Sequence, residues 1–132
     1  MIKVTSEIKE SLQAAKLAYL STASPDGTPN VVPIGAVKFL DDETLLISDQ
    51  YFGKTLRNLR ENPKIALAWW GEKGGFQLKA DITLHTEGEI FQKNVEWVHS
   101  IRATLEPKTA VVGKITDVYL VKGGPDAGKK IL

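Results

Sequence analysis

Short, strand-like runs separated by turn residues recur along most of this chain of 132 residues. We predict strands over residues 18–23, 30–39, 44–49, 65–70, 76–90 and 111–121, from their apolar or alternating patterns. Most of the links between them are too short for a crossover connection, so neighbouring strands should run antiparallel. The sequence therefore predicts a mainly β fold, in which six antiparallel strands close into a small barrel rather than a βαβ sheet.

Three further segments have the periodicity of amphipathic helices and should lie at the periphery of the barrel: residues 6–16, 53–62 and 92–105. The second helix should stop at Asn62, because the residue before a proline disfavours the helical region. The third carries an apolar stripe of Val95, Val98, Ile101 and Leu105. We expect residues 1–132 to form one domain with a mobile, glycine-rich tail over residues 123–132.

Composition argues against several classes of function. The 17 basic and 16 acidic residues nearly balance, so we expect no nucleic-acid partner. The chain has no cysteine, and His85 and His99 are isolated, so we expect no disulfide and no metal site. No apolar run reaches the roughly 18 residues of a membrane span, and no secretion signal is evident. We expect no membrane association and a cytoplasmic location.

The segment Gly53-Lys54-Thr55 follows a strand that ends in Ser48-Asp49, and it opens the second helix. Free backbone N–H groups at a helix start, together with the helix dipole, favour an anion there. Lys54 adds a positive charge and Thr55 adds a hydroxyl donor. A P-loop would need a glycine where Ser48 stands, so the segment fits one phosphate group rather than a nucleoside triphosphate. The alternative is an ordinary helix start with a solvated lysine.

The order of these motifs resembles the flavin-binding split β-barrel family related to pyridoxamine 5′-phosphate oxidase. The resemblance extends over residues 5–120 and rests on the runs 18–23, 26–29, 31–34, 46–49 and 54–67. It implies a split barrel of the FMN-binding type. It also implies a homodimer that holds flavin mononucleotide (FMN) in clefts between its two subunits.

The same resemblance assigns eight residues to the flavin site. Lys54 and Thr55 match the phosphate ligands, and Ser48 and Asp49 match the strand end beside the ribityl chain and phosphate. Val32, Pro33 and Ile34 match the strand that flanks the isoalloxazine ring, and Gln77 matches a polar side chain near the flavin. For Pro33 the alternative is an edge-strand proline, and for Gln77 it is a surface position. Trp69 and Trp70 should point to opposite faces of one strand.

The resemblance implies an FMN oxidoreductase or electron carrier, with a small molecule or a protein as redox partner. No acid–base pair, nucleophile or metal cluster stands out in the sequence, which suits a protein whose cofactor carries the redox chemistry. One alternative is a deazaflavin-dependent reductase, because residues 58–63 also resemble that branch. The other is a non-enzymatic module for flavin, haem or another cofactor. Vitamin B6 oxidation is not expected, since the tail lacks the basic and aromatic segment of true oxidases.

Overall fold

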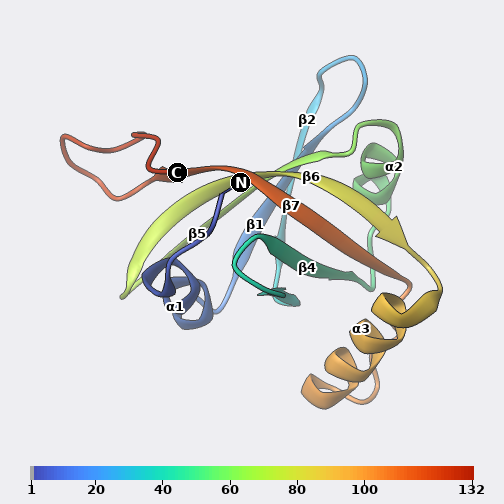
Figure 1. Ribbon diagram of the computed structural model, residues 1–132. Coiled ribbons are helices and arrows are strands. Elements are labelled where there is room, and N and C mark those ends of the chain that lie inside the picture. Colours follow the sequence, from blue (N-terminus) through green and yellow to red (C-terminus); the bar gives the residue numbers. More distant parts are fainter. Residues whose placement is uncertain (1) are drawn as a thin grey trace.

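The computed structural model describes residues 2–132 as a curled antiparallel sheet with helices around it (Figure 1). The strands are β1 Ala18–Ala23, β2 Pro29–Ile34, β3 Val37–Phe39, β4 Thr44–Asp49, β5 Lys64–Gly71, β6 Gly74–His85 and β7 Thr109–Leu120, and the helices are α1 Ser6–Ala14, α2 Lys54–Glu61 and α3 Gly88–Ile101. Within the described residues the sheet has seven strands in the order β2-β1-β5-β6-β7-β4-β3. The predicted mainly β split-barrel class is confirmed, but with seven strands rather than six.

The additional strand arises where one long strand was predicted over residues 30–39. In the structure this run divides at Gly35 and Ala36, and β2 and β3 lie at opposite edges of the sheet. The crossing is held in place where the backbone N–H of Ser48 donates to the carbonyl of Ala36 at 3.0 Å. The prediction of a single strand is wrong because apolar residues continue through the crossing and hide the break. The edge position expected for the Pro33 segment is confirmed, since β2 pairs only with β1.

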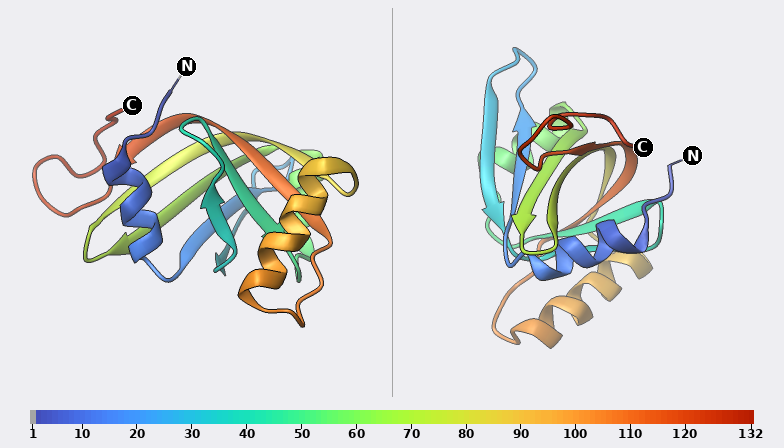
Figure 2. Two further views of the ribbon diagram at one scale, coloured as in Figure 1. Left: turned by 60° about the horizontal axis from the view of Figure 1, so that its bottom comes forward. Right: turned by 90° about the vertical axis from the view of Figure 1, so that its left-hand side faces the viewer.

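The core fills the inside of the curled sheet, whose curl can be followed in the right-hand view of Figure 2. Trp69 is 1% exposed, and its ring lies 6.3 Å from that of Phe39 and 6.1 Å from that of Phe76. Trp70, the next residue along β5, is 62% exposed on the outer face. The predicted alternation of the two tryptophans is therefore confirmed, and Trp69 is the core residue.

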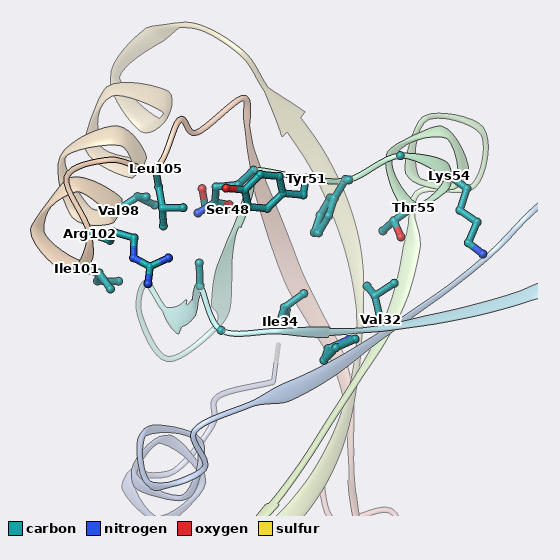
Figure 3. A pocket seen from close by; sticks show the side chains of 16 residues that line it. Val32, Ile34, Ser48, Tyr51, Lys54, Thr55, Val98, Ile101, Arg102 and Leu105 are labelled. Carbon is teal, nitrogen blue, oxygen red and sulfur yellow. The ribbon is translucent and has the colours of Figure 1, made fainter.

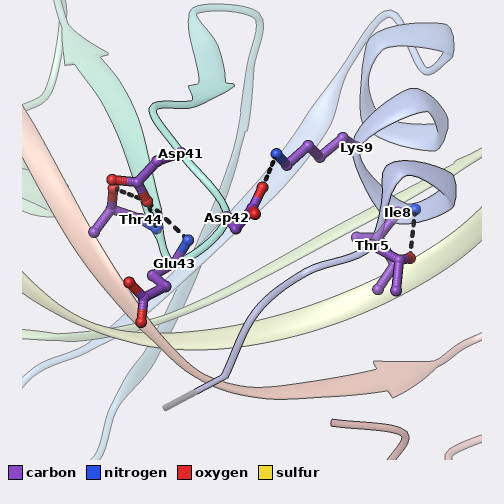
Figure 4. A network of polar contacts seen from close by, with 7 residues as sticks. All are labelled: Thr5, Ile8, Lys9, Asp41, Asp42, Glu43 and Thr44. Carbon is purple, nitrogen blue, oxygen red and sulfur yellow. Dashed lines mark hydrogen bonds and ion pairs between the residues drawn. The ribbon is translucent and has the colours of Figure 1, made fainter.

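Helix α1 is fixed to the turn between β3 and β4 by side-chain contacts (Figure 4). Thr5 caps the helix by accepting from a backbone N–H in its first turn, at 3.3 Å. Lys9 forms an ion pair with Asp42 in the turn. Asp41 stabilises the same turn by accepting from the backbone N–H and the hydroxyl of Thr44, both at 2.9 Å. The backbone N–H of Glu43 also donates to Asp41, at 2.8 Å. This bond and those from Thr44 lower the pKa of the Asp41 carboxyl.

The other two helices lie at the end of the sheet opposite α1 (Figure 1). α2 ends before Pro63, as predicted. α3 begins and ends about four residues earlier than predicted, because Gly88 adopts a φ of 91° that stops β6 and starts the helix. The helix ends at Arg102, where a tight turn joins the carbonyl of Arg102 to the N–H of Leu105 at 3.3 Å. The apolar stripe therefore extends beyond the helix that it predicted.

The C-terminal segment forms a loop and then returns to β7 (Figure 2). Tyr119 and Lys130 form an isolated antiparallel bridge, and the ammonium of Lys130 lies 3.0 Å from the carboxylate of Asp117. The mobility expected for this tail stays a prediction. Among residues 2–132 no helix is long and apolar enough to cross a membrane.

Candidate functional site

A cavity of about 830 Å³ opens where β2, β4, α2 and α3 meet (Figure 3). This volume lies within the range of small-molecule sites, which span roughly 300–1,000 Å³. The residues that line it are Val32, Pro33, Ile34, Gly35, Ala36, Ser48, Gln50, Tyr51, Phe52, Gly53, Lys54, Thr55, Val98, Ile101, Arg102 and Leu105. No aspartate or glutamate is among these lining residues, so the cavity favours neutral or anionic ligands.

One side of the cavity is built to receive an anion. Gly53 is the N-cap residue of α2 and makes no side-chain cap bond, and the first turn of the helix carries no acidic residue. Lys54 is exposed at this turn, and no ion pair of Lys54 is found among the described residues. The uncapped N–H groups, the helix dipole and the ammonium group therefore act in the same direction.

Two hydroxyls that line the cavity, those of Ser48 and Thr55, accept hydrogen bonds from asparagine amides. Asn94, on α3, donates from Nδ2 to Ser48 Oγ at 3.0 Å, and Asn94 is fully buried. Asn30, on β2, donates from Nδ2 to Thr55 Oγ1 at 3.0 Å and to Thr22 Oγ1 at 3.1 Å. The amide of Asn58 donates to the same Thr22 oxygen at 3.0 Å, so this network connects β1, β2 and α2.

The other side of the cavity is apolar. Val32 and Ile34 from β2 face Val98, Ile101 and Leu105 from α3 and the turn after it (Figure 3). Ile101 remains 61% exposed, whereas Val98 is completely buried. A slot with apolar walls and polar groups at one end suits a flat aromatic ligand that carries an anionic tail.

Arg102 lines the cavity from the end of α3, on the side away from Lys54 (Figure 3). The two cationic side chains therefore lie on opposite sides of the apolar slot. His99 projects from the same helix, where its Nε2 lies 3.1 Å from the carbonyl oxygen of Leu105. This contact ties the helix to the turn that carries one apolar wall of the cavity.

Six of the eight residues assigned to the site from sequence line this one cavity. They are Val32, Pro33, Ile34, Ser48, Lys54 and Thr55. Their role in holding a cofactor stays a prediction, but the structure brings them together from three separate elements.

The structure does not bring the other two residues to the cavity. Asp49 is fully buried, and its Oδ1 accepts from the backbone N–H of Phe52 at 2.8 Å, which fixes the loop before α2. Its Oδ2 is buried, and no donor reaches it from residues 2–132. Gln77 lies half-buried on the outer face of β6, in register with Ala68 and Tyr119. Strand alternation explains this position, because the core residues Phe76 and Leu78 flank Gln77.

Several residues of the site were not singled out from sequence. Asn30 and Asn94, which bond to hydroxyls of the cavity, and Arg102, which lines it, carry no local motif. Tyr51 also lines the cavity and is 84% exposed. The apolar stripe of residues 95–105 was recognised, but only as the apolar face of a peripheral helix. No cluster of His, Cys, Asp and Glu that could hold a metal ion occurs within residues 2–132.

Comparison with known proteins supports the family resemblance. The family model described as pyridoxamine 5′-phosphate oxidase matches residues 4–122. The chain belongs to this family. It is 42% identical over 134 residues to the uncharacterized protein MJ0282 of Methanocaldococcus jannaschii, covering 99% of this chain and 89% of that relative. The name of this relative indicates no function.

Solved structures of the pyridoxamine 5′-phosphate oxidase family type share the fold. HupZ from Group A Streptococcus superposes with a TM-score of 0.82 and 24% identity, over 95% of this chain and 99% of that chain. An FMN-binding protein from Syntrophomonas wolfei superposes with a TM-score of 0.79 and 18% identity, over 89% and 86% of the two chains. At these identities the likeness shows the fold alone, because one fold can host many functions.

Proposed function

We propose that this protein binds FMN in the cavity between β2, β4, α2 and α3, and that it works as an FMN-dependent oxidoreductase or electron carrier. One observation carries the proposal: a one-phosphate anion site, formed by Lys54, Thr55 and the uncapped start of α2, opens directly onto an apolar slot. FMN has this combination of a phosphate tail and a flat ring. The FMN-binding protein with the same fold supports the choice of cofactor.

The residues present fit the two parts of FMN. The phosphate suits Lys54, Thr55 and the free N–H groups of the first helical turn. The ring suits the slot between β2 and α3, where Val32 and Ile34 exclude water from one side. When bound, the flavin supplies hydride or electron transfer. The chain then contributes binding, orientation and exclusion of water, which are the roles that a cavity without acidic lining residues can fill.

We further propose that the protein is a homodimer whose interface includes the outer face of the sheet. Tyr19, Val31 and Trp70 are 50%, 63% and 62% exposed, and strand pairing places them on the outer face of the adjoining strands β1, β2 and β5. Large apolar side chains gathered on one face are typical of a surface that a protein partner covers. A second copy docked there would lie beside Pro33, which lines the cavity and pairs with Tyr19.

The direct test is the visible absorption spectrum of the freshly purified protein, followed by chromatography of whatever heat denaturation releases. We expect a two-banded flavin spectrum and released FMN. For colourless protein we expect FMN to bind on titration, with quenching of its fluorescence. A folded, colourless protein that takes up neither FMN nor riboflavin would refute the proposed cofactor.

A further inference from the structure

The hydroxyls of Ser48 and Thr55, which both line the cavity, have the same kind of support. Ser48 is 4% exposed and accepts from Asn94, and Thr55 is 2% exposed and accepts from Asn30. Each bond is 3.0 Å long, and in each the asparagine Nδ2 is the donor. These amides reach the hydroxyls from different elements, β2 and α3, so the arrangement does not follow from one local motif.

The direction of these bonds determines what each hydroxyl can do. A hydroxyl has one proton to donate and two lone pairs that accept. Once a lone pair faces an amide N–H, the proton has to point elsewhere. Among residues 2–132 no hydrogen bond is found in which Ser48 Oγ or Thr55 Oγ1 is the donor. Both protons are therefore free for a ligand in the cavity.

In the structure both amides turn their NH₂ end toward a hydroxyl. The Nδ2 of Asn30 faces two hydroxyl oxygens at once, those of Thr22 and Thr55, and it has one proton for each. For Asn94, the present orientation leaves one buried acceptor, Oδ1, without a partner. The reversed orientation would instead place the NH₂ group, with two donors, where no acceptor is found within residues 2–132, which costs more.

We propose that Asn30 and Asn94 are positioning residues that commit Thr55 and Ser48 to donation, so that the cavity selects a ligand that places a hydrogen-bond acceptor at each of them. For Thr55, which lies beside Lys54, that acceptor is the fully ionised phosphate of a phosphate monoester; Ser48 lies farther along the cavity, toward Val98, and donates to another part of the same ligand (Figure 3). Lys54 and the start of α2 attract the same charge, and no carboxylate among the lining residues opposes it. This inference rests on the proposed function, because it takes FMN as the ligand that carries the phosphate.

The test measures the dissociation constants of FMN and of riboflavin, which lacks the phosphate, for each variant of two double-mutant cycles. One cycle combines Asn30→Ala with Thr55→Val, and the other combines Asn94→Ala with Ser48→Ala. We expect Asn30→Ala and Thr55→Val each to weaken FMN about tenfold, the range for a hydrogen bond to a charged group, and to leave riboflavin nearly unchanged. We expect Asn94→Ala and Ser48→Ala to weaken FMN and riboflavin alike, because Ser48 lies away from the phosphate side of the cavity (Figure 3). We expect each asparagine change to have no further effect once its hydroxyl partner is absent.

Asn58→Ala is the matched control. Asn58 is 8% exposed and belongs to the same amide network, but it donates to Thr22 and to neither cavity hydroxyl. We expect this variant to keep the FMN-to-riboflavin affinity ratio of the wild type. If Asn94→Ala does not fold, Ser48→Ala removes only a hydroxyl and tests whether the Ser48 hydroxyl contributes to flavin binding.

The outcomes separate this inference from the proposed function. A wild-type protein that binds neither flavin refutes both. A wild-type protein that binds FMN and riboflavin with equal affinity refutes the inference and the phosphate assignment, but leaves flavin binding in place. The inference alone fails if Asn30→Ala weakens both ligands equally, or if either asparagine change adds to the effect of its hydroxyl deletion, because either result would show a merely structural role.

Discussion

The indole Nε1 of Trp69 donates a hydrogen bond to Ser11 Oγ at 2.8 Å, and this bond fastens α1 to the centre of the barrel. Trp69 is 1% exposed and Ser11 is fully buried, so water cannot replace either partner. The same hydroxyl donates to the carbonyl of Ile8 at 2.7 Å. A short polar chain thus continues from a backbone carbonyl of α1 to a core side chain of β5.

We predict that Ser11→Ala lowers the free energy of unfolding by about 1–3 kcal/mol, because it leaves a buried indole N–H without an acceptor. Ser100→Ala is the control, since Ser100 makes the same kind of bond to a carbonyl three residues earlier, at 2.6 Å, but is exposed. Its effect should stay within about 0.5 kcal/mol. Urea denaturation of both variants measures the difference, and equal effects would contradict the assigned role of the Trp69 bond.

Gly75 tests how tightly β5, β6 and the segment after β7 pack. A Cβ at this position would lie 2.7 Å from the Trp70 ring, 2.9 Å from Val121 and 3.0 Å from the backbone oxygen of Trp69. Because backbone cannot move aside as a side chain can, we predict that Gly75→Ala destabilises the protein by about 1–3 kcal/mol. Gly123→Ala, where nothing lies within 4 Å, should be close to neutral in the same denaturation experiment.

Features built from contiguous sequence could be predicted. The anion site needs only the end of β4, a short loop and the first turn of α2, so residues 48–55 carry its whole signal. The hairpin partners β5 and β6 are also local, and their residues alternate between core and surface as expected. These parts depend on local propensity and periodicity, which one sequence displays directly.

Features built from distant residues could not be predicted. Asn94 and Ser48 are separated by 46 positions, and no pattern in either segment shows that they meet. The crossing at Gly35 is hidden for a related reason: it depends on closure of the curled sheet, not on a change of local composition. Gln77 lies on the outer face, as alternation along β6 requires, and its assignment near the flavin stays a prediction.

The ion pair of Asp117 and Lys130 should add to the backbone hydrogen bonds that join the C-terminal tail to β7, and it does so only while both groups are charged. The hydrogen bond from Lys130, and then that from Thr116, lower the pKa of Asp117, and the same pair raises the pKa of Lys130. A carboxyl with a lowered pKa stabilises the fold above the ordinary carboxyl range and loses that effect as the pH falls through its lowered pKa. A lysine with a raised pKa loses its effect as the pH rises through that value.

We therefore predict that the tail moves least between about pH 4 and pH 10 and becomes more mobile outside that window. Backbone ¹H–¹⁵N heteronuclear NOE values for residues 123–132 would report this motion. Asp117→Asn should make the tail more mobile already at neutral pH. Asp126→Asn, an exposed change within the tail itself, should not. Equal NOE values in the wild type and in Asp117→Asn would contradict the anchoring role of the ion pair.

The proposed dimer predicts a linked effect on assembly and ligand binding. Tyr19 is half-exposed on the outer face of the sheet and pairs with Pro33. Pro33 and the two residues beside it in β2 line the cavity. We expect Tyr19→Lys to shift sedimentation equilibrium toward the monomer and to weaken FMN, because a buried ammonium without a partner opposes association. Gln13→Lys, at an exposed position of α1, adds the same single positive charge and serves as the control. A wild-type monomer would remove the proposed interface.

Lys54 gives the sharpest test of the anion site. Lys54→Ala removes the charge at the start of α2, and we predict a loss of FMN affinity of about 1–3 kcal/mol, the range for a charge-assisted hydrogen bond. Riboflavin should bind as it does to the wild type, because it has no phosphate. Arg60→Ala is the matched control, since Arg60 is exposed on the last turn of the same helix and does not line the cavity. It removes the same charge from α2 and should leave the affinity for FMN almost unchanged. If both variants weaken FMN equally, general electrostatic attraction accounts for binding; if neither does, the phosphate does not lie at the start of α2.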